Sequence, residues 1–220
     1  MPIPLKYLAD FEEGSIYHIY NRTNNREALF LNDDNRIFFL KRYKELLTPF
    51  VDTYCWCLLS NHFHLLVKMK SNDIIEYFLK SKSITELTII EKKFMAGKAN
   101  FSELIEHVFK RFFQSYALAF NKVHKRHGNL FYKPFKRVRI EKDSQFTMAM
   151  VYIHANAVKH GLVKDFASYE WSSWHTIISY KPTLLAKETV INWFGSLELC
   201  IKAHNELVIH YYDCEVAIED

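Results

Sequence analysis

The sequence predicts an α+β fold, because its apolar residues follow strand and helix periods in a definite order along the chain. A strand comes first, then a helix, two strands, a group of helices, a fourth strand and a further helix. Of the 220 residues 49% are hydrophobic, and only five are glycine and five proline, which suits a sizeable core better than a loop-rich chain. This order predicts a ferredoxin-like split β-α-β layout with a central antiparallel sheet covered by helices.

The first half of the chain supplies three of the four predicted strands. They cover residues 15–21, 51–59 and 62–70, with a helix over 33–48 and a connection or bulge at 60–61. Asp33 and Asp34 are expected to cap the helix, and Pro49 ends it. In the first strand His18 and Tyr20 share one face, because side chains two apart in a strand point the same way.

The second half is predominantly helical. The predicted helices cover 74–79, 84–94, 101–126, a segment from Asp143 or Ser144 to the Gly161 stop, 169–179, 190–194 and 197–210, with the fourth strand around 138–140. Lys181-Pro182 is expected to interrupt regular secondary structure after the last motif. We therefore expect one main domain over residues 1–180 and a C-terminal helical extension over 181–220.

Composition excludes several classes of protein. The formal net charge of +4 is a modest excess, and no apolar run approaches the 18 residues of a membrane span. The first residues hold no apolar core of signal-peptide length. The cysteines form no Cys-x-x-Cys pattern, which predicts free thiols in a reducing compartment at Cys55, Cys57, Cys200 and Cys214. A cytoplasmic protein is expected.

Two histidines in the third predicted strand are candidate metal ligands. His62 and His64 point to one face of that strand, and Phe63 packs on the other. With 11 histidines in the chain, chance alone gives about half a His-x-His per sequence, so the triplet by itself is weak. Two imidazoles on one strand face make a half-site for a divalent metal, which we expect to be Mg²⁺ or Mn²⁺, although spacing alone leaves the metal ambiguous and does not exclude Zn²⁺.

A second candidate element is the helix Met150-Val-Tyr-Ile-His-Ala-Asn156. Tyr152 and Asn156 are four residues apart and share one helical face, whereas His154 falls on the far side. If that face meets the histidine strand, Asn156 completes a three-ligand metal site and Tyr152 is a nucleophile beside it. The plainer interpretation of Tyr152 is one more packed tyrosine among 13.

Positive charge gathers between residues 110 and 142. This basic stripe has ten cations against the single acid Glu141: Lys110, Arg111, Lys122, Lys125, Arg126, Lys133, Lys136, Arg137, Arg139 and Lys142. Aromatic residues interleave it, a mixture suited to single-stranded or hairpin nucleic acid. We predict DNA contacts from Lys133, Lys136, Arg137 and Arg139. The alternative is a solvated basic surface with no ligand.

These motifs together carry a resemblance. Tyr17-His-Ile-Tyr-Asn-Arg-Thr-Asn-Asn-Arg26, His62-Phe63-His64, Gly128-Asn-Leu-Phe-Tyr-Lys-Pro-Phe-Lys136 and Tyr152-Ile-His-Ala-Asn156 follow in the order of the single-tyrosine HUH transposases, and most resemble the REP-associated tyrosine transposase branch. The sequence departs from the family pattern at Ser60 and Ala157, where the family usually has proline. The resemblance favours a DNA contact for Arg22, whose polar loop would otherwise be taken as a solvated turn.

The resemblance implies metal-dependent cleavage and rejoining of single-stranded or hairpin DNA through a covalent 5′-phosphotyrosine at Tyr152, as in DNA transposition. Two alternatives stay open: a catalytically inactive DNA- or RNA-binding regulator on the same fold, and a small-molecule metal hydrolase, which the lack of a carboxylate base in the motifs disfavours. The sequence does not decide between a monomer and a homodimer with a shared site.

Overall fold

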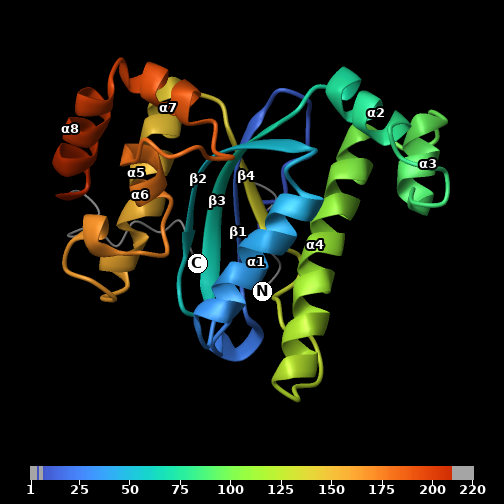
Figure 1. Cartoon of the computed structure of the whole chain (residues 1–220), viewed down its shortest axis with the longest axis horizontal. Helices are drawn as coiled ribbons and strands as arrows, with labels where there is room; N and C mark the ends of the chain where they lie inside the picture. Colours follow the sequence, from blue (N-terminus) through green and yellow to red (C-terminus); the bar gives the residue numbers. More distant parts are fainter. Residues whose placement is uncertain (1–3, 5–6, 210–220) are drawn as a thin grey trace.

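A four-stranded antiparallel sheet forms the centre of the molecule, with the strand order β2-β3-β1-β4 (Figure 1). The computed structural model describes residue 4 and residues 7–209. The strands are β1 (Ile16–Arg22), β2 (Val51–Leu58), β3 (His62–Met69) and β4 (Lys136–Ile140). This order and the helices between the strands are those of the ferredoxin-like α+β fold, so the predicted fold class is confirmed.

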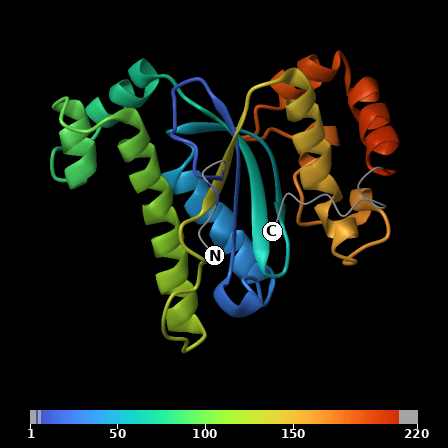
Figure 2. The same cartoon turned by 180° about the vertical axis from the view of Figure 1, so that it is seen from behind.

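Helices cover both faces of the sheet (Figures 1 and 2). One face carries α1 (Asp33–Leu46) and α4 (Phe101–Val123). The other carries α5 (Asp143–Lys159), with α6 (Trp174–Ile178), α7 (Lys187–Phe194) and α8 (Leu197–Leu207) around it. The short helices α2 (Asn72–Lys80) and α3 (Ile89–Met95) lead from β3 to α4, and two 3₁₀ turns occupy Asn24–Arg26 and Phe166–Ser168.

Side chains of β3 alternate between two separate hydrophobic cores, one on each face of the sheet. Phe63 points toward α1 and α4, and its ring centroid lies 5.0 Å from that of Phe39. Leu66 points the other way, into the core under α5 that also holds Met150 and Ile153. Because the period of a strand is two, His64 and Leu66 share a face, and His64 therefore faces α5.

The starts of two helices differ from prediction. The cap of α1 is Asn32, whose side-chain oxygen accepts a hydrogen bond from the backbone N–H of Asn35 at 3.0 Å. Asp33 is already in the first turn, where its charge still favours the helix dipole. In α5 the helix begins at Asp143, and the Gln145 side chain accepts the Lys142 N–H at 3.0 Å. When several polar residues are adjacent in the sequence, their spacing alone does not show which of them is the N-cap of the helix.

The described residues bear on two further expectations. Cys55, Cys57 and Cys200 are free, buried thiols, as predicted, whereas Cys214 lies outside the described residues. The helix predicted over 197–210 ends at Leu207, and residue 210 is likewise outside them. Within the described part of the chain, every helix is too short or too polar to cross a membrane.

Candidate functional site

The two strand histidines lie side by side on the sheet face that α5 covers. Their ring centroids are 5.3 Å apart; His64 is fully buried and His62 partly buried. Across the antiparallel β1–β3 pair, Arg22 lies opposite His62 and Tyr20 opposite His64. Directly opposite residues share a face of the sheet, so both β1 side chains flank the histidines.

Each histidine is oriented by a partner at Nδ1. His62 Nδ1 lies 2.6 Å from the side-chain oxygen of Asn61, which only accepts, so in the neutral ring Nδ1 carries the hydrogen and Nε2 the lone pair. His64 Nδ1 is 2.8 Å from Nε2 of His18, a buried residue of β1. Such partners of metal-binding histidines fix the tautomer and the ring orientation. His18 is absent from the predicted site, although its face of the strand was predicted.

Helix α5 brings the predicted nucleophile to these rings. The Tyr152 ring centroid lies 5.8 Å from that of His64 and 6.0 Å from that of His18, and 1% of the residue is exposed. One turn later the Asn156 amide donates from Nδ2 to the Tyr152 carbonyl at 3.0 Å. Its Oδ1 is buried and accepts no hydrogen bond from the described part of the protein. A buried acceptor of this kind is suited to a cation.

Two further residues at the end of α5 reach the site. Lys159 Nζ donates to Tyr152 Oη at 3.5 Å and lies 5.1 Å from the centre of the phenol ring. The ring centroid of His160 is 4.6 Å from that of His62. Lys159 is seven residues, or about two helical turns, after Tyr152, so spacing could have found it. Sequence analysis assigned neither residue a role.

The candidate ligands His62 and His64 make a three-ligand site for a divalent cation only if the side-chain oxygen of Asn156 is included. Two imidazoles, His62 and His64, come from β3, and the buried oxygen comes from Asn156. Among the described residues there is no cluster of three or more His, Cys, Asp or Glu side chains placed to hold a metal ion. A mixed nitrogen and oxygen set of this kind accepts Mg²⁺, Mn²⁺ or Zn²⁺.

Three of the predicted DNA-contacting residues are accessible from this face or its edge. Arg22 is exposed, with its guanidinium 5.6 Å from the ring centre of Tyr132. Lys136 Nζ lies 5.5 Å from the ring centre of Tyr20, which stacks on His64. Lys133 is exposed in the segment that precedes β4. Cations and aromatic rings therefore border the histidines.

The other two predicted residues lie elsewhere. In β4, Arg137 and Arg139 pair with Ile19 and Tyr17 of β1 and so point to the α4 side of the sheet. Arg137 is 6% exposed, donates from Nε to the carbonyl of Ala9 at 2.7 Å and lies 3.6 Å from Glu106. Arg139 forms an ion pair with Glu12. Both guanidinium groups are therefore engaged in contacts within the protein.

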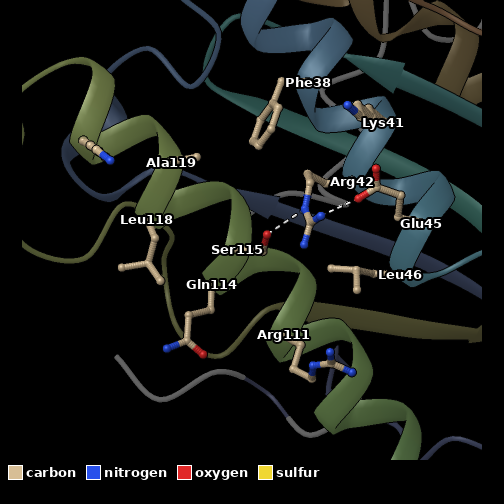
Figure 3. A pocket seen from close by; sticks show the side chains of 11 residues that line it. Phe38, Lys41, Arg42, Glu45, Leu46, Arg111, Gln114, Ser115, Leu118 and Ala119 are labelled. Carbon is tan, nitrogen blue, oxygen red and sulfur yellow. Dashed lines mark hydrogen bonds and ion pairs between the residues drawn. The ribbon is translucent and has the colours of Figure 1, made fainter. Parts of the chain in front are cut away.

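Two cations of the basic stripe, Arg111 and Lys122, line a separate groove between α1 and α4 (Figure 3). These helices and Tyr152 belong to cores on opposite faces of the sheet. Cations from α1 and α4 border it: Lys41, Arg42, Arg111 and Lys122. Arg42 donates from Nε to Ser115 Oγ at 2.7 Å and pairs with Glu45. Arg111 lies 3.6 Å from Glu91. The stripe is therefore divided between two faces, and part of its charge is neutralised internally.

His154 lies on the far side of α5, as predicted, where it belongs to a buried hydrogen-bond network. Ser173 Oγ accepts the Trp56 N–H at 2.9 Å and donates to His154 Nε2 at 2.9 Å. His154 Nδ1 then donates to His204 Nε2 at 3.0 Å, and His204 Nδ1 to the Cys200 carbonyl at 2.8 Å. Burial lowers the pKa of His154 well below its ordinary value and that of His204 to about 4. Both rings are neutral, and they join α5 to α8.

Comparisons with known proteins concern the chain as a whole. No protein-family model matches the chain. A curated protein of Haemophilus influenzae (strain ATCC 51907 / DSM 11121 / KW20 / Rd) that carries the name "Putative REP-associated tyrosine transposase" is 24% identical over 206 residues, covering 89% of this chain and 97% of that protein. A solved REP-associated tyrosine transposase bound to a REP hairpin has a TM-score of 0.50 and 17% identity, covering 79% of this chain and 86% of the other. The second likeness concerns the fold; together they confirm the resemblance that the motifs predicted.

Proposed function

We propose that this relative of the REP-associated tyrosine transposases cleaves and rejoins single-stranded DNA beside a hairpin, with Tyr152 as the nucleophile. The observation that carries the proposal is the packing of the Tyr152 ring 5.8 Å from the His64 ring, within one chain. The same helix places the buried amide oxygen of Asn156 one turn after the phenol, and a nucleophile beside an imidazole and a candidate metal ligand suits phosphoryl transfer. One chain supplies all of these groups, which favours a site that needs no second subunit.

The proposed reaction exchanges one ester for another. Tyr152 Oη forms a bond to the scissile phosphorus as the bond from phosphorus to the 3′ oxygen breaks. The products are a 5′-phosphotyrosine and a free 3′-hydroxyl, and the phenolic hydrogen ends on that 3′ oxygen through solvent. Because the covalent link conserves the phosphodiester energy, attack by another 3′-hydroxyl reseals the strand without ATP.

His62, His64 and Asn156 would hold Mg²⁺ or Mn²⁺. Such an ion polarises the scissile phosphate and neutralises the charge that builds on its oxygens. The chain's own part is to fix the histidine rings: Asn61 binds Nδ1 of His62, and His18 binds Nδ1 of His64. A rigid strand pair therefore orients both imidazole rings before the substrate arrives.

The DNA strand is proposed to cross the β1–β4 side of the site. Arg22 and Lys136 offer charge to its phosphates, and Tyr132 a surface for base stacking. The solved relative binds a REP hairpin, which makes a hairpin with single-stranded flanks the substrate to try first. The free thiols of the described chain suit a reducing compartment, and we place the activity in the cytoplasm.

The test is covalent capture. A 3′-labelled hairpin with single-stranded flanks is incubated with protein and Mn²⁺, and adducts are separated under denaturing conditions, because the 5′-phosphotyrosine keeps the fragment that carries the 3′ end. We expect an adduct with the wild type, none with Tyr152→Phe, and hairpin binding by both. An adduct that persists in Tyr152→Phe would contradict the proposed nucleophile.

The rival function is a DNA-binding regulator on an inactive transposase fold. Ser60 and Ala157, which replace the usual prolines of the family pattern, are the observations that favour it. Ala157 is fully buried beside Asn156, so a changed backbone there would act on a proposed metal ligand. Tight hairpin binding with no adduct across a broad panel of hairpins and metals would support the regulator.

A further inference from the structure

The side chain of Lys159 lies against the phenol of Tyr152. Its Nζ is 3.5 Å from the phenol oxygen and 5.1 Å from the ring centre. We infer that Lys159 is a second catalytic residue, which stabilises negative charge on the Tyr152 oxygen in both cleavage and rejoining. The inference rests on the proposed function and adds to it a group outside the predicted site.

A tyrosine needs such a partner to attack phosphorus. A phenol has an ordinary pKa of about 10, so few molecules are ionised near neutral pH, and attack must develop charge on the oxygen. With 1% of Tyr152 exposed, water does not solvate that charge. A fixed cation in a water-poor site stabilises it far better than the same cation would in solution.

The simpler role for Lys159 is to favour the helix dipole, because it is in the last turn of α5. A lysine that served only this purpose would extend into solvent. Instead, the side chain is partly buried and turns back two helical turns toward the site face, over the ring of Tyr152. Lys164, five residues further on, is exposed and offers a matched comparison.

In the proposed step Lys159 transfers no proton and acts only through its position beside the phenol oxygen. As the bond from Tyr152 Oη to phosphorus forms and the bond to the 3′ oxygen breaks, the electron pair of the broken bond goes to the 3′ oxygen, which gains the hydrogen that the phenol lost. In rejoining, a 3′-hydroxyl attacks the phosphotyrosine and the phenol oxygen leaves with the electron pair. The ammonium of Lys159 faces that oxygen at both moments, so its removal should slow both directions.

The experiment compares Lys159→Met, Lys159→Arg and the control Lys164→Met in single-turnover adduct formation on the labelled hairpin with Mn²⁺. Hairpin affinity is measured for each variant in parallel. We expect Lys159→Met to slow adduct formation on the order of 100-fold with less than about a threefold change in affinity. Lys159→Arg should recover most of the rate, and Lys164→Met should match the wild type.

An independent readout reports the contact itself. In protein labelled with 3-fluorotyrosine, the ¹⁹F signal that disappears in Tyr152→Phe should shift in Lys159→Met and stay in place in Lys164→Met. An unshifted signal, an unchanged rate, or a loss of rate explained by an equal loss of affinity would each overturn the inference. A wild type that forms no adduct would overturn the proposed function, and this catalytic role with it, whereas failure of the inference alone leaves a Tyr152-dependent adduct intact.

Discussion

Nε2 of His18 lies 2.8 Å from Nδ1 of His64, and both rings are buried between the sheet and α5. One ring donates and the other accepts, so the pair determines which nitrogen of His64 keeps its lone pair. Tyr20 stacks on both rings, with centroids 4.9 Å from His18 and 5.4 Å from His64. The candidate metal ligand is therefore held by β1 as well as by its own strand.

Replacing His18 should weaken metal binding without removing a proposed ligand. We expect His18→Phe to reduce Mn²⁺ affinity about 10- to 100-fold, because the ring of His64 would lose the partner that orients it. Isothermal titration calorimetry of the DNA-free protein measures this directly. His175→Phe, at an exposed histidine, is the control. Equal affinities for the two variants would mean that His18 only packs.

Asn156 should show a conflict between stability and metal binding. Its buried Oδ1 accepts no hydrogen bond from the described residues, and an unsatisfied polar atom destabilises a folded protein by about 1–3 kcal/mol. Asn156→Leu, of similar size, should raise the thermal midpoint of the metal-free protein and abolish its increase on adding Mn²⁺. Calorimetric scans with and without the ion test both effects. A lower midpoint without metal would show that Nδ2 and its bond to Tyr152 matter more.

The two faces of the sheet should separate DNA binding from stability. Arg22→Met should weaken hairpin binding and lower the salt dependence by about one phosphate contact, with an unchanged thermal midpoint. Arg137→Met should destabilise the fold by about 1–3 kcal/mol, because it removes a buried guanidinium bound to Ala9 and Glu106. Salt-dependent fluorescence anisotropy and urea unfolding provide the two measurements. A large loss of hairpin affinity in a stable Arg137→Met variant would support the predicted DNA contact of Arg137.

Acid should destabilise the protein through His204. Its pKa in the folded protein is about 4, below the ordinary 6.5, because burial disfavours the charged ring. When the pH falls from about 6.5 toward 4, the unfolded chain binds a proton that the folded protein does not. The free energy of unfolding should therefore decrease, by on the order of 3 kcal/mol at the lower end of this window. His154 acts in the same direction.

Urea unfolding between pH 7.5 and 4.5 measures this dependence. His204→Phe should be less stable than the wild type at pH 7.5, because His154 loses a hydrogen-bond partner, yet its stability should decline less steeply with acid. His175→Phe should keep the slope of the wild type. Parallel slopes for all three proteins would exclude His204 as the origin.

Local periodicity accounts for what could be predicted. A period of two sent Phe63 and His64 to opposite faces, and a helical period put Tyr152 and Asn156 together with His154 behind them. The order of elements predicted the sheet correctly. These relationships depend on residues close in sequence, whose relative directions are fixed once the element type is known.

Contacts between elements were beyond that reasoning. The pairing of His18 with His64 depends on the register of β1 against β3, and the link from His154 to His204 on where α8 packs. The basic stripe was counted along the sequence, although alternation in β4 sends Lys136 and Arg137 to opposite faces. A run of like charge in the sequence therefore predicted one basic surface, whereas the fold distributes these residues over both faces of the sheet.

The burial of Tyr152 also affects how the protein can be studied before any DNA is added. Reagents that iodinate or nitrate tyrosine reach Tyr77 and Tyr180, which are 79% and 96% exposed, whereas Tyr152 is sheltered at 1%. In the proposed reaction a nucleic acid strand would have to part the side chains around the phenol before phosphorus could approach it. For the proposed cleavage, admission of the strand, ahead of any bond breaking, is therefore expected to limit the first turnover.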